Sequence, residues 1–179
     1  MRETYRTFVF DLDGTLVRLA VDWDAAADAV AAALRDRGIE PPDSLWAMLE
    51  TADERGVRGA VEEVLSEHER DGAERSTRLP AADTVPSAPV GVCSLNCRAA
   101  CLIALSEHDI GGIDTDAVVG RDTVPTEKPD PEPLSETIRR LEGDPATTLF
   151  IGDTDRDETT AQRAGVDYAD VSAWLRAYR

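Results

Sequence analysis

Lysine is almost absent from this chain. Lys128 is the single lysine among 19 basic residues, the others being arginine, whereas aspartate and glutamate together number 36. The formal charge of −17 leaves no basic face, so nucleic acid and anionic membranes are not expected partners. Such a composition resembles that of haloarchaeal cytosolic proteins, because molar salt shortens the screening length to about 3 Å and weakens self-repulsion. An acidic protein from a GC-rich mesophile is the alternative.

Histidine and cysteine are also scarce, which limits the metal and nucleophilic sites that the chain can build. His68 and His108 stand apart and are expected on solvated helix surfaces. Cys93, Cys97 and Cys101 are spaced by four. Their odd number argues against a disulfide framework, and no fourth ligand lies nearby for an iron–sulfur or zinc site. We expect them to act as small apolar residues.

Long hydrophobic runs are missing as well. No apolar stretch approaches the roughly 20 residues that span a bilayer, and the charged opening residues do not resemble a signal peptide. We therefore predict a cytoplasmic protein. Its 179 residues, 42% of them apolar, suffice for one core and a modest appendage.

Five short apolar runs predict strands, and none alternates cleanly, as is typical of strands buried on both faces of a parallel sheet. They are Thr7–Asp11, Val90–Ser94, Ala117–Gly120, Thr148–Gly152 and a weaker run near Tyr168–Val171. Helical segments separate the last four strands. This alternation predicts an α/β fold with a doubly wound parallel sheet.

Three helices are predicted between these strands. The first spans Asn96–His108, with Asn96 as its cap. The second, Pro131–Leu141, follows Asp130 as N-cap and has proline in its first turn. The third, Asp157–Ala164, ends at Gly165, a left-handed C-cap; Asp155 is expected to cap its start.

The segment from Val17 to Pro86 shows no strand signal and predicts amphipathic helices. One spans Trp23–Arg37, with Asp22 as cap and Trp23 on its apolar side. Another follows Asp43 as cap, and a third spans Arg58–Glu69 before a polar connection. We interpret residues 18–86 as a helical cap inserted after the first strand, and residues 1–17 and 87–179 as the α/β core.

Polar side chains follow three of the predicted strands. Asp11 and Asp13 follow the first, Ser94 the second, and Asp153 and Asp157 the fourth. Ligands bind beyond the carboxyl ends of parallel strands, so these residues are expected at one edge of the sheet.

The single lysine lies in a loop that can reach the same edge. Asp11 and Asp153 offer an oxygen-rich site suited to Mg²⁺, and the Ser94 hydroxyl and Lys128 ammonium are donors for phosphoryl oxygens. Arginine would not replace Lys128, because its planar fork is too wide for the space between carboxylates and phosphate. Isolated turn or helix-cap roles would explain each acidic pair alone, but not the whole set.

The ordered set resembles the haloacid dehalogenase-like hydrolases. It comprises Asp11-Leu12-Asp13-Gly14-Thr15, then Ser94, then Lys128-Pro129, then Gly152-Asp153 with Asp157 four residues on. The helical insertion looks like the C1-type cap of that superfamily, so the resemblance covers essentially the whole chain. Asn96 departs from it, because many relatives carry asparagine directly after the hydroxyl residue rather than two positions later.

The resemblance implies roles for these residues. Asp11 would be the nucleophile that forms an aspartyl-phosphate, and Asp13 the acid and base, with its backbone carbonyl also on Mg²⁺. Ser94 and Lys128 would hold the phosphoryl group. Asp153 would bind Mg²⁺, and Asp157 would bind or support it. An acid at position 13 favours phosphate esters over haloacids and phosphonates.

The predicted function is a Mg²⁺-dependent phosphatase of small phosphomonoesters, similar to phosphoglycolate phosphatases, acting as a monomer or homodimer. A phosphomutase or phosphotransferase would use the same aspartates. A receiver-like signalling domain or a non-catalytic binding protein fits the motif order less well. Arg55 and Arg58 are candidates for a substrate carboxylate or second phosphate, although solvated arginines at helix ends are the more common situation.

Overall fold

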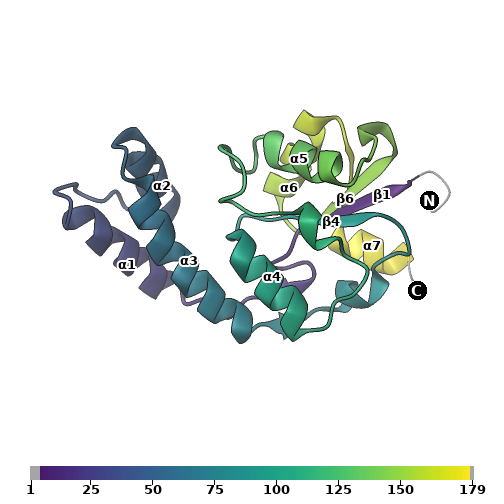
Figure 1. The fold of residues 1–179 in the computed structure, drawn as a ribbon, viewed down its shortest axis with the longest axis horizontal. Helices are drawn as coiled ribbons and strands as arrows, with labels where there is room; N and C mark the ends of the chain where they lie inside the picture. Colours follow the sequence, from purple (N-terminus) through teal and green to yellow (C-terminus); the bar gives the residue numbers. More distant parts are fainter. Residues whose placement is uncertain (1–4, 178–179) are drawn as a thin grey trace.

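The computed structural model describes residues 5–177 and shows a parallel sheet with a helical insertion at one end (Figure 1). The sheet order is β5-β4-β1-β6-β7, and every neighbouring pair is parallel. All five predicted strands and the α/β fold class are confirmed. The strands are β1 (Thr7–Phe10), β4 (Val90–Cys93), β5 (Val118–Val119), β6 (Thr148–Gly152) and β7 (Asp167–Asp170).

Helices cover both faces of this sheet, because successive residues of β1 bury their side chains on opposite sides. Phe8 and Phe10 belong to the buried cluster that includes residues of α4 (Arg98–Glu107) and Trp174 of α7 (Val171–Ala177). Val9 joins the cluster beneath the other two helices. Those helices are α5 (Glu132–Arg140) and α6 (Asp155–Ala164). Short 3₁₀ turns occupy Pro80–Thr84, Thr115–Ala117 and Pro145–Thr147.

Several predicted helix ends need correction. Cys97, not Asn96, is the N-cap of α4, and it makes no side-chain cap bond. Thr154, not Asp155, is the N-cap of α6, because its hydroxyl accepts from the Asp157 N–H in a capping box. Pro131 occupies the cap position of α5, although the Asp130 carboxylate does accept from the Glu132 N–H at 2.9 Å. Gly165 closes α6 in the left-handed conformation, as predicted.

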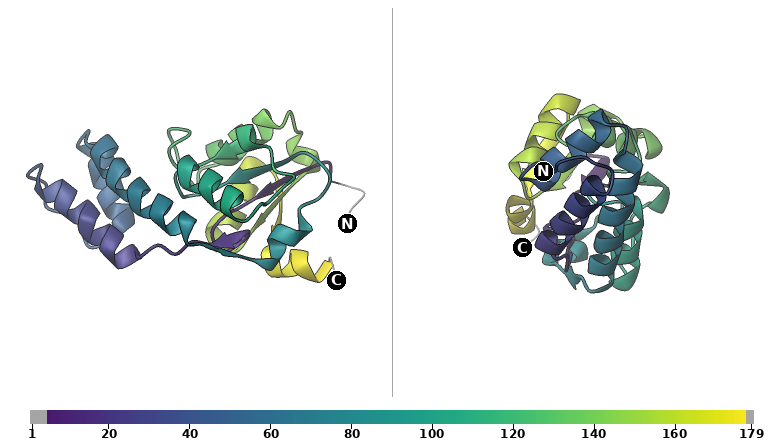
Figure 2. Two further views of the ribbon diagram at one scale, coloured as in Figure 1. Left: turned by 60° about the horizontal axis from the view of Figure 1, so that its bottom comes forward. Right: turned by 90° about the vertical axis from the view of Figure 1, so that its left-hand side faces the viewer.

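The prediction that residues 17–86 contain no strand is wrong. β2 (Val17–Arg18) pairs antiparallel with β3 (Thr77–Arg78), and this two-stranded ribbon joins the insertion to the core (Figure 2). Two-residue strands are too short to leave a period in the sequence. Between them lie α1 (Trp23–Arg35), α2 (Leu45–Glu54) and α3 (Arg58–Glu74).

The three inserted helices bury a hydrophobic cluster of their own, which includes Val30, Leu34, Leu49 and Leu65. Asp22 caps α1 as predicted, whereas Ser44 rather than Asp43 caps α2. Trp23 was expected on the buried side of α1 but is 41% exposed.

Helix α3 continues past the predicted end at Glu69 to Glu74. Its last turns are buried against the connection into α1, where a Cβ on Gly72 would lie 2.5 Å from a Val21 methyl carbon. This tertiary contact outweighs the polar composition of the segment. Within residues 5–177, no helix has the length and apolar character needed to cross a membrane.

Candidate active site

Asp11 lies directly beyond β1, and the chain then turns sharply. The Asp11 N–H bonds the Ile151 carbonyl at 2.8 Å, which continues the β1–β6 ladder by one residue. Gly14 has φ of +90°, and a Cβ there would lie 2.1 Å from Asp153 Oδ2. Glycine at position 14 therefore permits both the turn and the close approach of Asp153.

A cluster of one ammonium and two carboxylates, here the lysine cluster, lies at this edge of the sheet. Lys128 Nζ donates to Asp11 Oδ1 at 2.7 Å, to Asp157 Oδ1 at 2.5 Å and to the Cys93 carbonyl at 3.2 Å. Lys128 is 3% exposed and follows the loop after β5. The structure thus brings together three of the predicted site residues that are far apart in the sequence.

Charge in this cluster is out of balance. Burial raises the pKa of Asp11 to about 7, with Lys128 opposing the rise and Asp157 adding to it. Burial also raises the pKa of Asp153, and the carboxylates of Asp157 and Asp13 raise it further. Burial alone would lower the pKa of Lys128, but Asp11 and Asp157 more than reverse this and keep the ammonium protonated. Lys128 therefore pairs with two carboxylates directly, and two more, those of Asp153 and Asp13, lie nearby, with Arg18 opposing the rise in the pKa of both.

The donor set fits a hard divalent cation. Carboxylate oxygens of Asp11, Asp153 and Asp157 lie within 4.8 Å of one another. Ions such as Mg²⁺ prefer oxygen ligands and take one or two carboxylates with water and phosphate oxygens. A cation here would also offset the excess negative charge. The Asp13 carboxylate is not in this group.

Asp13 and Ser94 are near the cluster but have other partners. The Leu19 N–H donates to Asp13 Oδ1 at 2.9 Å, and burial raises the pKa of Asp13 above its ordinary value. The buried Ser94 hydroxyl donates to Asn96 Oδ1 at 3.2 Å and accepts from the Asn96 N–H at 3.1 Å. Ser94 is therefore oriented by Asn96, whose side chain lines the cavity beside the lysine cluster.

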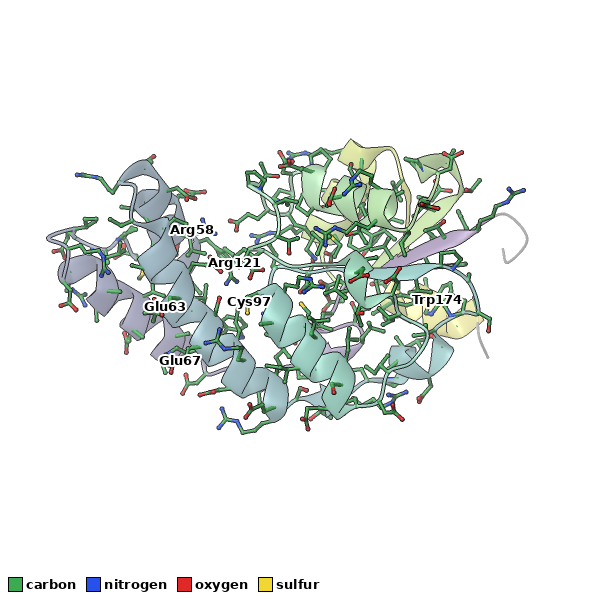
Figure 3. All side chains as sticks on the ribbon, in the orientation of Figure 1. Arg58, Glu63, Glu67, Cys97, Arg121 and Trp174 are labelled. Carbon is green, nitrogen blue, oxygen red and sulfur yellow. The ribbon has the colours of Figure 1, made fainter. Side chains whose placement is uncertain are left out.

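A second buried cluster, here the arginine cluster, ties the insertion to the core. Arg121, 4% exposed, donates from Nη1 to Glu69 Oε1 at 2.5 Å and from Nη2 to Glu69 Oε2 at 2.9 Å. Its Nε donates to Glu62 Oε1 at 2.9 Å, Nη2 also pairs with Glu62, and Nη1 reaches the Leu95 carbonyl at 2.7 Å. Figure 3 shows Arg121 between α3 and the core.

The arginine cluster also holds the loop that carries Ser94 and Asn96. Glu69 accepts from the Cys97 N–H at 2.9 Å and from Asn96 Nδ2 at 3.3 Å. A Cβ on Gly120 would lie 2.3 Å from the Arg98 nitrogen, so glycine lets the loop after β5 close against that after β4. Helix α3 is thereby fixed to two strand ends of the site.

One feature of the sequence indicates a site role for Arg121. It directly follows the predicted strand Ala117–Gly120, and so lies at the same sheet edge as the aspartates. The predicted site draws on the ends of the other three strands and does not include Arg121. Glu62 and Glu69 lie seven residues apart on one face of α3, but a helix exposed on that face shows the same pattern.

The predicted specificity arginines lie outside the cavity. Arg58 pairs with Asp53 at 2.6 Å and with Glu62 and Glu127 at 3.2 Å, and Arg55 is exposed at the end of α2. The cavity, about 150 Å³, lies between core and insertion. Its lining includes Asp11, Asp13, Glu69, Arg121, Lys128, Asp153 and Asp157, together with Trp23, Leu45, Trp46, Leu65 and Leu95.

The structure places the cysteines as expected but not His108. Cys93, Cys97 and Cys101 are free and buried, as expected of small apolar residues. His108 differs from its prediction, because it is half-buried and its Nε2 lies 2.9 Å from the Ser76 hydroxyl.

Known proteins resemble this chain over nearly its whole length. The haloacid dehalogenase-like hydrolase family matches residues 87–171. A phosphoglycolate phosphatase of Aquifex aeolicus is 30% identical over 94% of this chain and 85% of its own length. One from Cereibacter sphaeroides is 31% identical over 90% of this chain and 82% of its own.

Solved structures share the fold. A hydrolase from Pseudomonas syringae has a TM-score of 0.68 at 20% identity, covering 97% of each chain. CbbY from Rhodobacter sphaeroides, solved with phosphate, has a TM-score of 0.62 at 14% identity, covering 93% of this chain and 85% of its own. These structures show the shared fold, whereas the family match and the two relatives above identify the protein: it is an enzyme of the haloacid dehalogenase-like hydrolase family, in the phosphatase group that includes phosphoglycolate phosphatases.

Proposed function

We propose that this enzyme is a Mg²⁺-dependent phosphatase of small phosphomonoesters that uses Asp11 as a covalent nucleophile. The observation that carries the proposal is the hydrogen bonding of the two Asp11 carboxylate oxygens. Lys128 holds one of its oxygens at 2.7 Å, and among residues 5–177 no hydrogen bond reaches the other. A buried carboxylate with one fixed and one open oxygen is suited to attack phosphorus.

Asp11, Asp153, Asp157 and the backbone carbonyl of Asp13 are the proposed metal ligands. Their support is the close grouping of the three carboxylates. Asp157 also bonds Lys128 through Oδ1 and Thr154 through Oδ2, so it fixes the lysine as well. When bound, Mg²⁺ supplies charge that offsets the repulsion between the carboxylate and the phosphate ester.

The proposed reaction has two balanced steps. In the first, the open Asp11 oxygen bonds phosphorus, the ester P–O bond breaks, and the leaving alkoxide takes the proton held by Asp13. In the second, water attacks the aspartyl-phosphate and gives a proton to Asp13. Inorganic phosphate leaves and the Asp11 carboxylate is restored. The raised pKa of Asp13, caused first by burial, supports its role as the proton carrier.

Lys128 and Ser94 are the proposed partners of the phosphoryl oxygens. The ammonium lies at 2.7 Å from Asp11 and thus close to the reacting phosphorus. Ser94 bonds Asn96 in this structure, so its hydroxyl would turn toward the substrate on binding. Residues 18–86 are the proposed cap over the core of residues 1–17 and 87–179. Their support is a cavity lined from both sides.

The test is release of nitrophenol from p-nitrophenyl phosphate by purified protein with Mg²⁺ or with EDTA, in dilute and in molar KCl. We expect Mg²⁺-dependent turnover that is lost in Asp11→Asn and kept in Asp28→Asn, a matched change at an exposed residue of α1. The salt series also tests the predicted halophilic character. Turnover that persists in EDTA, or in folded Asp11→Asn, would contradict the proposal.

A further inference from the structure

The insertion presents apolar side chains to the catalytic cavity. Trp23, Leu45, Trp46 and Leu65 line it from the insertion, opposite the carboxylates and Lys128 on the core. The cavity is small, about 150 Å³. The part of a substrate that extends beyond its phosphate would therefore meet hydrocarbon and indole surfaces.

The two tryptophans of the insertion are unusually placed. Trp23 is 41% and Trp46 36% exposed, and they are the large exposed hydrophobic side chains of residues 5–177. Both line this one cavity, although they belong to different helices. The Arg156 guanidinium lies 4.8 Å from the Trp46 ring centre and holds it against the core by a cation–π contact. Exposed aromatic surface gathered at one site marks a binding surface.

The two cations that line the cavity, Lys128 and Arg121, are already engaged, and the Arg156 guanidinium lies against the Trp46 ring. Lys128 donates to two carboxylates and a carbonyl. All five N–H groups of Arg121 are used, one or more on each of Glu62, Glu69 and the Leu95 carbonyl. A carboxylate or second phosphate on the substrate would thus meet apolar rings and the excess acid of the site, where an unpaired anion is strongly disfavoured.

We propose that the substrate is a phosphomonoester whose leaving group carries an uncharged ring, packed against Trp23 and Trp46. This inference rests on the proposed function and specifies its substrate class. It differs from phosphoglycolate, the compound in the relatives' names, whose leaving group carries a carboxylate. Trp23 and Trp46 are the specificity residues, and Arg55 and Arg58 are not.

The first measurement compares three alkyl esters with similar leaving alcohols: benzyl phosphate, ethyl phosphate and 2-phosphoglycolate. We expect kcat/KM for benzyl phosphate to exceed that for 2-phosphoglycolate by about tenfold or more, with ethyl phosphate between them. Trp46→Ala and Trp23→Ala should each lower the benzyl value about tenfold and leave the ethyl value within about twofold. Trp46→Phe should retain most of the benzyl preference, and Glu50→Ala, an exposed change on α2, controls for general damage to the insertion.

The second measurement separates this inference from the proposed function. Calorimetry with the intact protein and Mg²⁺ compares 2-phenylethylphosphonate with 3-phosphonopropionate, in which CH₂ replaces the bridging oxygen. Tighter binding of the phenyl compound, lost in the tryptophan variants, supports the inference even if no ester is hydrolysed. Tighter binding or faster turnover of the carboxylate compounds, unchanged by Trp46→Ala, would overturn it. Turnover of benzyl phosphate that is unaffected by both tryptophan changes would also overturn it.

Discussion

The lysine cluster and the arginine cluster each place one nearly buried cation between two carboxylates. Lys128 lies between Asp11 and Asp157, and Arg121 between Glu62 and Glu69. In the arginine cluster every donor is taken, and both glutamates accept further bonds from α3 or the loop after β4. In the lysine cluster, one oxygen of Asp11 faces the cavity without a hydrogen bond from any residue of the described chain.

This difference follows from the shape of the two cations. A guanidinium is planar, and its fork fixes two carboxylates in paired contacts, which suits a permanent joint between α3 and the core. An ammonium is compact and rotates its three donors freely, so it can hold Asp11 while leaving room for a phosphoryl group. The single lysine among the 19 basic residues stands at this position, where we expect a compact cation to be required.

Exchanging the cation type in the lysine cluster is the strongest test of that reasoning. We expect Lys128→Arg to lower kcat by about 10³-fold, because the wider fork displaces Asp11 or fills the phosphoryl position. Steady-state kinetics on p-nitrophenyl phosphate measure the loss. Lys128→Met, which keeps length without charge, should lose at least as much. Near-normal kcat in a folded Lys128→Arg variant would show that compactness is not what the site requires.

In the arginine cluster, removal of the cation should mainly affect stability. Arg121→Met leaves Glu62 and Glu69 without their main partner, and breaking a buried ion pair in this way costs about 3–5 kcal/mol. Urea denaturation followed by circular dichroism measures the free energy of unfolding. Arg163→Met, at an arginine bonded only to the Pro129 carbonyl within the described chain, is the control. Equal losses of unfolding free energy in the two variants would show that the arginine cluster does not specifically stabilise the contact between α3 and the core.

Much of the fold was predictable because burial leaves a local pattern. Thr148–Gly152 has Leu149, Phe150 and Ile151 in succession, and it forms β6 at those bounds with every residue buried. The ribbon of β2 and β3 was not predictable, since two-residue strands depend on a partner 60 residues away. Helix α3 was extended by packing of Gly72 on Val21, which the polar sequence does not show.

The candidate site also contains residues whose placement was predictable from the sequence and others whose placement was not. Asp11, Lys128 and Asp157 were predictable as neighbours because parallel strands bring their carboxyl ends to one edge. The partners of Arg121 were not, because they depend on where a helix of the insertion meets the core. The exposure of Trp23 was not predictable either. The helical period that placed it among buried residues does not distinguish a side chain in the core from one that lines a cavity.

Crowding in the lysine cluster can be tested through Gly152. A Cβ at this position would lie 2.7 Å from the Asp157 Cβ and carboxylate atoms, so Gly152→Ala must displace Asp157 from Lys128. We expect a stability loss of about 1–3 kcal/mol with a lower kcat. Gly165→Ala is an informative comparison, because it carries left-handed strain without any neighbour within 4 Å. If only Gly165→Ala lost stability, the close approach of Asp157 would be excluded as the reason for glycine at 152.

The smallest expected effect is the pH dependence of the arginine cluster. The pKa of Glu62 is lowered from its ordinary 4.5, since its bonds to Arg121 and Arg58 outweigh the opposing effect of burial. The unfolded chain therefore takes up this proton at higher pH than the folded one, and the stabilisation is present above about pH 4.5 and lost below it. The free energy of unfolding of the wild type should exceed that of Glu62→Gln by about 1 kcal/mol at pH 7. This difference should shrink toward pH 3. Glu63→Gln removes the same charge from the exposed side of α3 and is the control for net charge. A difference that stays constant with pH would mean that Glu62 contributes through packing rather than through its charge on Arg121.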